Sequence, residues 1–199
     1  MTAAPQTVSF ALTSDRRLIA GTASAGPAVP FDYDPSDPPS FPGAGCLTFG
    51  GLRAQPEPGF RKDVLSFVSA PLERQLDVRG QMKLRLAVTS DCDDTAFYVR
   101  GSVRKADGKW YTRRDDIKSI AWDTPNYAPG TEATIDYTLS DHAFRLEKGD
   151  CLRLDVAGAN VAAFIPHTNF KGPFVEQAKS RVAHNAIVAG KCTLFLPTL

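Results

Sequence analysis

The sequence predicts an all-β fold, an antiparallel β-sandwich of the jelly-roll type. From Met82 onward, apolar and polar residues alternate in several short runs, which is the period of strands with one buried face. Turn signals separate these runs: Asp107-Gly108 favours a tight hairpin, and Pro129-Gly130 marks a second turn. Hydrophobic residues make up 43% of the 199 residues, which is enough for the core of one sandwich.

The alternation assigns a side to each residue of the expected strands. The residues expected to point inward are Leu84, Leu86, Val88, Phe97, Val99, Val103, Ile135, Tyr137, Leu139, Leu152, Leu154 and Val156. The residues expected to face water are Lys83, Arg85, Tyr98, Arg100, Arg104, Thr134, Asp136, Thr138, Arg153 and Asp155.

Two segments depart from this pattern. Residues 27–58 hold eight of the fifteen prolines and show no apolar period, so we expect a long extended connector that lies against something. Residues 174–185 carry Phe174, Val175, Ala178 and Val182 at helical spacing, which predicts one short helix. We accordingly divide the chain into an N-terminal strand and Pro/Gly-rich connector at 1–62 and a jelly-roll domain at 63–199.

Charge and hydropathy narrow the possible partners. The chain has 23 basic and 22 acidic residues and a net charge of +1, which gives no reason to expect nucleic acid or an anionic membrane. No apolar run reaches the roughly 20 residues that span a bilayer, and the first thirty residues lack a signal-peptide pattern. We therefore expect a cytoplasmic protein.

The four cysteines, Cys46, Cys92, Cys151 and Cys192, lie far apart with no C-x-x-C pair. This spacing argues against a zinc site or a redox motif. In a cytoplasmic protein we expect them to be reduced structural thiols. We expect no metal and no cofactor.

Ordered segments along the chain carry a family resemblance. They are Phe10 to Leu18, Tyr33-Asp34-Pro35-Ser36-Asp37-Pro38, Asp63-Val64-Leu65-Ser66-Phe67, Pro71-Leu72-Glu73, Leu76 to Gly80, Asp94 to Phe97, Ala106-Asp107-Gly108, Leu146 to Leu154, and Leu194-Phe195-Leu196-Pro197. In this order they resemble the C-terminal non-catalytic domain of serine hydrolases of the X-Pro dipeptidyl-peptidase and cocaine-esterase type. The resemblance implies a galactose-binding-like jelly roll without the hydrolase's catalytic domain.

The resemblance is interrupted after the last long strand. Val161-Ala162-Ala163-Phe164 stands where the family has "phe-pro-arg-phe", and residues 166–172 replace an asparagine-rich loop. Gly149-Asp150 stands where the family has "gly-his".

No catalytic residue is expected. A serine hydrolase needs a G-x-S-x-G turn between a strand and a helix. The nearest string, residues 21–26 around Ser24, has one residue too many and no helix after it. The histidines His142, His167 and His184 lack metal-ligand spacing, and we expect surface or hydrogen-bonding roles for His142 and His184. His167 lies in the loop that departs from the family and is a candidate functional residue.

Asp91, Asp93 and Asp94 form an acidic cluster. Three carboxylates on one loop could contribute to a calcium site. Aspartates at the start of a strand also commonly form local turn hydrogen bonds, and we favour this interpretation.

Aromatic residues suggest two candidate surfaces. A platform for a small molecule or a carbohydrate could form from Trp110, Tyr111, Arg113, Trp122, Tyr127 and His167, although the aromatic residues could equally belong to an interface or to the core. A surface for a partner could form from Phe31, Tyr33, Phe41, Leu47, Phe49, Leu52 and Phe60.

Three functions fit these observations. The first is a non-catalytic domain that braces an α/β-hydrolase catalytic domain, helps to close its active site or supports oligomerisation. The second is a free-standing jelly roll with its own small-molecule or carbohydrate site, either with or without a new enzymatic role. The third is a homo-oligomerisation module. The chain enters the family pattern near its start and ends where that pattern ends, which fits either a separate gene product or an excised domain.

Overall fold

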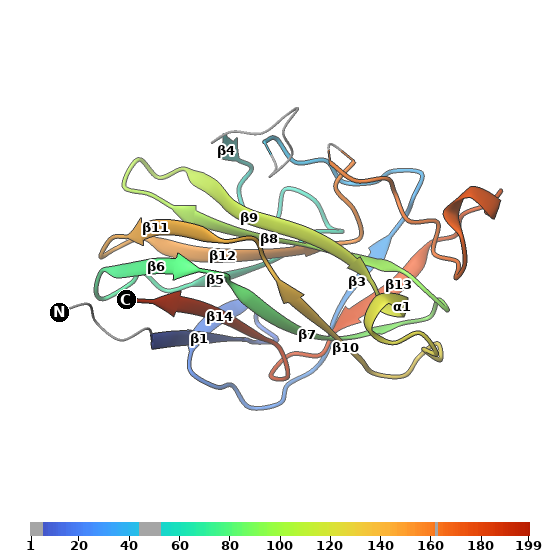
Figure 1. The fold of residues 1–199 in the computed structure, drawn as a ribbon, viewed down its shortest axis with the longest axis horizontal. Helices are drawn as coiled ribbons and strands as arrows, with labels where there is room; N and C mark the ends of the chain where they lie inside the picture. Colours follow the sequence, from blue (N-terminus) through green and yellow to red (C-terminus); the bar gives the residue numbers. More distant parts are fainter. Residues whose placement is uncertain (1–5, 44–52, 162) are drawn as a thin grey trace.

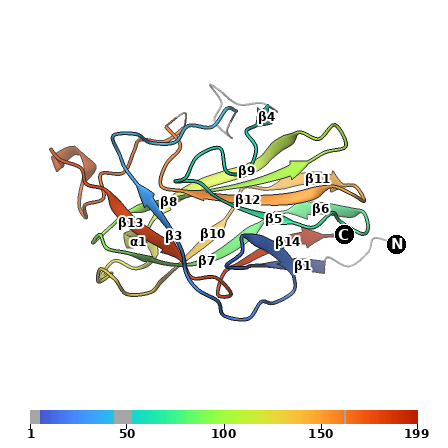
Figure 2. The same ribbon diagram turned by 180° about the vertical axis from the view of Figure 1, so that it is seen from behind.

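A computed structural model describes residues 6–43, 53–161 and 163–199, and these residues form an all-β, mostly antiparallel sheet of fourteen strands. Figures 1 and 2 show the sheet from its two sides. The elements are β1 (Gln6–Leu12), β2 (Arg17–Ala20), β3 (Val29–Tyr33), β4 (Ala54–Gln55), β5 (Leu65–Ser69), β6 (Leu76–Gly80), β7 (Lys83–Ser90), β8 (Ala96–Arg104), β9 (Trp110–Ser119), α1 (Ile120–Asp123), β10 (Ala133–Thr138), β11 (His142–Leu146), β12 (Cys151–Ala157), a 3₁₀ turn (Phe174–Glu176), β13 (Ala183–Ile187) and β14 (Thr193–Thr198).

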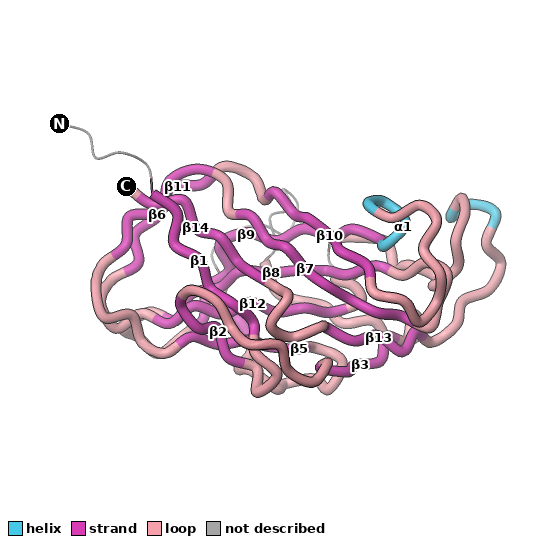
Figure 3. The backbone as a smooth tube through the Cα atoms, turned by 90° about the horizontal axis from the view of Figure 1, so that it is seen from below, coloured by secondary structure: helices cyan, strands magenta, loops and turns pink. Residues whose placement is uncertain are grey.

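The sheet folds back on itself to enclose the core. Hydrogen-bonded neighbours follow the order β3-β13-β7-β14-β1-β2-β5-β12-β8-β9-β4, while β10 adds to β7, β6 adds to β14 and β11 adds to β6. Strands β9, β8, β12 and β5 run along one side of the molecule, and β7, β14 and β1 run along the other (Figure 1). The short parallel pair of β2 and β5 joins the two sides, as Figure 3 shows from below.

The inward residues were predicted correctly. Leu84, Val88, Phe97 and Ile135 are each at most 1% exposed, and Leu152 is 4% exposed. All twelve residues expected to point inward are buried, and all twelve belong to one large apolar cluster. The turns also form as expected, because Gly108 and Gly130 adopt positive φ angles of 79° and 81°.

On the opposite face of β8 and β12, Arg104 is exposed as expected, but the expectation that the other residues of this face lie in water was wrong. Tyr98, Arg100 and Asp155 have no exposed surface, and Arg153 is 1% exposed. The connector covers this face: the ring of Phe41 stacks on that of Tyr98 at 5.2 Å in a second apolar cluster. Period-two alternation therefore identified the core face but could not reveal that the other face is covered as well.

The connector is also more regular than expected. Val29–Tyr33 pairs with β13, and Ala54–Gln55 pairs with β9, so two strands interrupt the proline-rich stretch. Pro30 is tolerated because β3 is the end strand of the sheet, where a missing N–H costs no ladder bond. At the N-terminal side, β1 lies between β14 and β2.

The helix expected at 174–185 was wrong. Only Phe174–Glu176 forms a helical turn, and Ala183–Ile187 is a strand. Strand β13 pairs with both β3 and β7, and these ladder bonds prevail over the local helical spacing. In the described part of the chain, no helix is long and apolar enough to cross a membrane.

Candidate functional site

Exposed apolar side chains concentrate in residues 161–182, which we call the apolar excursion; its Ala162 lies outside the described residues. It leaves the body of the domain after β12 and returns at β13 (Figure 1). Val175 is 90% exposed and Ile165 is 70% exposed. Of the eight large apolar side chains exposed in the described ranges, five belong to the excursion: Val161, Ile165, Phe174, Val175 and Val182. Single exposed apolar residues are ordinary, but the number in this one segment makes the excursion the candidate site.

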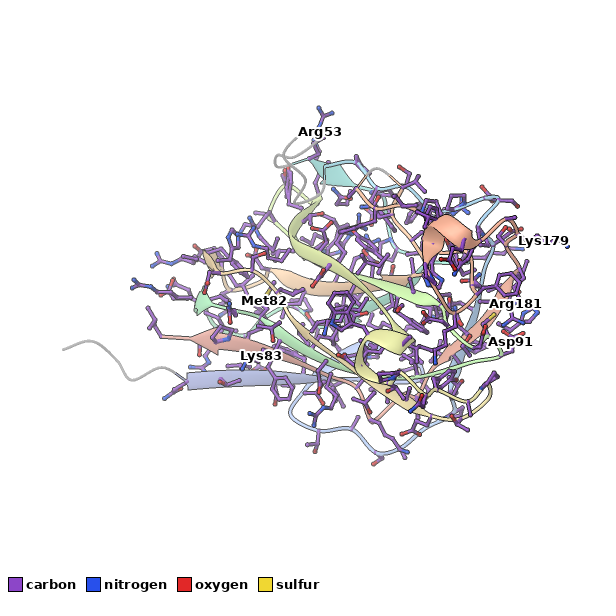
Figure 4. The ribbon with its side chains drawn as sticks, turned by 45° about the vertical axis from the view of Figure 1, so that its right-hand side comes forward. Arg53, Met82, Lys83, Asp91, Lys179 and Arg181 are labelled. Atoms are coloured by element: carbon purple, nitrogen blue, oxygen red, sulfur yellow. The ribbon has the colours of Figure 1, made fainter. Side chains whose placement is uncertain are left out.

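An ion pair and hydrogen bonds fix the base of the excursion to the loop between β7 and β8 and to the loop between α1 and β10. The carboxylate of Asp93 accepts a hydrogen bond from the guanidinium of Arg181 at 2.8 Å, and a second at 3.4 Å from the backbone N–H of Lys171. The ammonium of Lys171 bonds to the carbonyl oxygen of Pro125. Figure 4 shows Arg181 at the same end of the molecule as Asp91.

Asn169 is the buried anchor of the excursion. Its amide oxygen accepts a hydrogen bond from the hydroxyl of Thr95 at 2.8 Å, and its amide nitrogen donates to the carbonyl oxygen of Arg181 at 2.6 Å. Its backbone adopts a φ angle of 69°, a left-handed conformation that asparagine tolerates better than most residues. The excursion is therefore held in place although its tip is exposed.

His167 belongs to this anchor and is poorly placed for catalysis. Its Nε2 lies 3.4 Å from Oδ2 of Asp94, and its Nδ1 accepts a hydrogen bond from the backbone N–H of Asn169 at 3.0 Å. Both ring nitrogens are thus engaged, which leaves neither nitrogen free to take a proton from a substrate. The backbone carbonyl of His167 accepts a hydrogen bond from the hydroxyl of Tyr33 at 3.2 Å.

The acidic cluster accepts one local backbone hydrogen bond, at Asp94, and also accepts hydrogen bonds from distant segments. Oδ1 of Asp94 accepts hydrogen bonds from the N–H groups of Thr95 and Ala121, and Oδ1 of Asp91 accepts one from the N–H of His184. No group of three or more His, Cys, Asp or Glu side chains suited to a metal ion occurs within the described ranges.

The aromatic residues do not form one platform. Trp110 and Tyr127 are buried, with exposed fractions of 2% and 7%, whereas Trp122 is 75% exposed. Tyr111 and Arg113 are half-buried on β9. Trp110 begins β9 and Trp122 lies in α1 beyond its end, so a ten-residue strand separates the two indole rings. His167 lies in the excursion, where its Nε2 faces Asp94, whose carboxylate also accepts a hydrogen bond from the N–H of Ala121 in α1.

The suggested partner surface is largely occupied by the chain itself. Phe31, Tyr33 and Phe41 are at most 5% exposed, because β3 pairs with β13 and the connector packs on β8. Phe60 is 36% exposed, and its ring contacts that of Phe41 at 5.6 Å. Leu47, Phe49 and Leu52 lie outside the described residues.

Ser24, His142 and His184, the other residues considered for catalysis, lie on three different elements of the fold. Ser24 lies in a loop between β2 and β3, and no helix follows it there. His142 begins β11, with its ring 5.1 Å from that of Phe144. His184 is on β13, where its Nδ1 lies 2.8 Å from Oδ1 of Asp32, and this carboxylate raises the pKa of His184.

Sequence reasoning missed a buried charged layer beneath the connector. Asp155 accepts hydrogen bonds from Arg100 at 2.6 and 3.1 Å and from Arg153 at 2.6 Å, and the hydroxyl of Ser66 donates to it at 2.5 Å. Arg100 also donates to the side chain of Gln55 in the connector. Burial lowers the pKa of Arg153, whose Nη2 has no hydrogen-bond partner. The sequence does place opposite charges on two expected strands, which could have indicated this layer. Only the register of β8 and β12 shows that Arg100 and Asp155 are paired.

Solved structures with this architecture are longer chains. The first comparison is an aminopeptidase from the marine sediment archaeon Thaumarchaeota archaeon, with a TM-score of 0.85 and 16% identity over 98% of this chain and 37% of that chain. An α-amino acid ester hydrolase gives a TM-score of 0.83 and 16% identity over 96% of this chain and 36% of the other. A CocE/NonD family hydrolase from Staphylococcus aureus gives a TM-score of 0.63 and 14% identity over 98% of this chain and 36% of the other.

These likenesses define the class of the molecule, a β-sandwich domain whose fold also occurs within longer chains. The chain spans about 37% of the aminopeptidase it matches. A search of curated protein sequences returned no significant relative. Residues 3–193 match the family of the X-Pro dipeptidyl-peptidase C-terminal non-catalytic domain, and the chain belongs to this family.

Proposed function

We propose that this chain is a non-catalytic accessory domain that packs against an α/β-hydrolase catalytic domain through the apolar excursion. The observation that carries the proposal is the exposure of Ile165, Phe174 and Val175 on a segment whose base is anchored. An anchored apolar surface can be covered by a partner with little ordering cost. Contacts between domains of one chain typically bury about 600 to 1,500 Å², and a 22-residue excursion could supply much of one side.

The family supports this role, because its description is that of a non-catalytic domain of a peptidase. The described residues support it too, since Ser24 and the three histidines do not come together with a helix-borne nucleophile. We therefore expect the isolated chain to hydrolyse neither aminoacyl-proline anilides nor aryl esters. Turnover that disappears in Ser24→Ala would contradict this.

Sedimentation and chemical cross-linking test the docking role. The isolated chain should self-associate at high micromolar concentration, or capture a hydrolase from the cells that express it, and Val175→Asp should abolish either contact. Leu199→Asp is the matched control, because Leu199 is 53% exposed outside the excursion. The captured protein must carry a serine-nucleophile domain, and its cross-links must reach residues 163–182.

Two outcomes would overturn the proposal. One is a monomer at all concentrations that captures no hydrolase. The other is capture that Val175→Asp leaves unchanged, because the hydrolase would then dock on another surface.

The cytoplasmic location remains part of the proposal. Cys92, Cys151 and Cys192 are buried and unpaired, which suits a reducing compartment. Fractionation of the native cells with an antibody to the chain tests this location, and recovery outside the cytoplasm would refute it.

A further inference from the structure

A second surface feature lies away from the excursion, in the space between β2 and the loop that joins β5 to β6. Strands β2 and β5 pair only at Arg17 with Val68 and at Leu18 with Ser69. Beyond Ser69, Ala70 and Pro71 lead the chain away from β2, and proline has no N–H with which to continue a ladder. The two strands diverge there and leave a groove of about 570 Å³.

The floor of this groove is the edge of the main apolar core. Phe10, Leu18 and Leu76 line it, and each belongs to that core with at most 8% of its surface exposed. Val8 and Leu72 extend the apolar wall toward the surface, where both are half-buried. The volume falls within the range of about 300 to 1,000 Å³ that is typical of small-molecule sites.

The mouth of the groove is polar and carries an excess of positive charge. Arg17 lines it from β2, and Arg74 and Glu73 line it from the loop between β5 and β6. In the described part of the chain, neither guanidinium makes an ion pair or a side-chain hydrogen bond. By contrast, Arg61, Arg85 and Arg145 each pair with an aspartate.

An apolar floor beneath two unpaired guanidiniums matches one class of ligand. We propose that the groove binds an aliphatic carboxylate, with its hydrocarbon chain along Phe10, Leu18 and Leu76 and its carboxylate between Arg17 and Arg74. Guanidinium groups bind carboxylates through paired hydrogen bonds, and the apolar chain would be removed from water. This site is separate from the excursion and does not depend on the docking role.

Calorimetric titration of the isolated chain with hexanoate, octanoate and decanoate, each below its aggregation concentration, tests the apolar part of the proposal. The affinity should rise about fourfold for each added methylene. Decanol should bind more weakly than decanoate, because it cannot pair with the guanidiniums. No binding of any acid, or an affinity independent of chain length, would overturn the proposal.

Variants at the mouth test the charged part. Arg17→Gln and Arg74→Gln should each lower the affinity for decanoate about two- to fivefold, which is the range expected for exposed ion pairs. Neither substitution should change the affinity for decanol. Glu73→Gln should raise the affinity for decanoate, because it removes a negative charge near the carboxylate of the ligand. Arg53→Gln is the matched control, because this exposed arginine lies at the edge of the molecule opposite β1 (Figure 4). Equal binding of acid and alcohol to all variants would refute the role of the arginines.

A blocking variant locates the ligand. Ala70 is exposed and lines the groove, so Ala70→Trp should fill it and abolish binding while the unfolding midpoint stays the same. Ala128→Trp, at an exposed position in the loop before β10, is the control and should bind decanoate normally. If Ala70→Trp binds decanoate like the unaltered chain, the ligand lies elsewhere and the proposal fails. Binding of an apolar peptide alone, without any aliphatic acid, would also contradict it.

Discussion

Arg100 and Asp155 face each other across neighbouring strands and form a fully buried ion pair that two hydrogen bonds hold together. The register of β8 and β12 sets the two residues directly opposite, and Oδ2 of Asp155 accepts from both Nε and Nη2 of Arg100. The guanidinium also lies 4.0 Å from the ring centre of Phe41 in the connector. The pair thus ties the sheet to the segment that covers it.

Removal of the shared carboxylate should destabilise the domain strongly. Asp155→Asn leaves Arg100 and Arg153 buried without a counter-charge, and breaking such a pair typically costs about 3 to 5 kcal/mol. Urea unfolding measures this loss. Asp136→Asn is the control, because its pair with Arg85 is exposed and should contribute less than about 1 kcal/mol. Similar losses for both variants would show that the buried layer is not a special contributor.

Truncation of a core side chain tests the strand register. Leu152 is 4% exposed on β12, so Leu152→Ala should reduce the free energy of unfolding by about 2 to 5 kcal/mol. Leu199→Ala, at a 53% exposed position, should change it by less than about 0.5 kcal/mol. A loss below about half a kcal/mol for Leu152→Ala would require a different register for β12.

Gly158 is required by a close approach of Tyr33. A Cβ at position 158 would overlap the tyrosine ring and lie 2.6 Å from its Cβ, while Tyr33 is fully buried and has no space to move. Gly158→Ala should therefore destabilise the domain by about 1 to 3 kcal/mol in thermal or urea unfolding. Gly101→Ala is the control, because its nearest neighbour, Cε of Met82, would be at an ordinary 3.6 Å. Equal effects would refute the steric explanation.

Alkaline pH should weaken the fold through its buried thiols. Burial raises the pKa of Cys192 and of Cys92 from 9.0 to about 11. Above pH 9 the unfolded chain releases these protons before the folded chain does, so the free energy of unfolding should fall between about pH 9 and 11. Urea unfolding at several pH values measures the slope. If the free energy of unfolding falls less steeply with pH in Cys192→Ser than in Cys151→Ser, part of the pH dependence belongs to Cys192. Identical slopes in the two variants would contradict that assignment.

The sequence predicted the sandwich and its core because both depend on local alternation. Leu84, Leu152 and their neighbours could be placed from period two alone. The burial of the other face of β8 and β12 depends on contacts between distant residues, such as Arg100 with Gln55 and Tyr98 with Phe41. The alternation of apolar and polar residues carries no information about such contacts.

The candidate site was predicted less well for the same reason. His167 was singled out because its loop departs from the family, and the structure places it in the anchor of the excursion. The exposure of Val175 was missed, because its spacing with Phe174 and Val182 favours a helix unless the pairing of β13 is known. Likewise, the groove beside β2 depends on where two strands diverge, which no local pattern encodes.

The pairing of β1 with β14 affects how this domain is made. Gln6 lies opposite Thr198, so strands from the two ends of the described chain are neighbours in the sheet (Figure 1). A ribosome releases the partner of β1 only when almost all of these residues have been synthesised, and such distant contacts slow folding. Until then, the backbone groups of β1 that β14 will bond remain open to other strands. Emergence from the ribosome is therefore the period in which this chain is most exposed to misassembly.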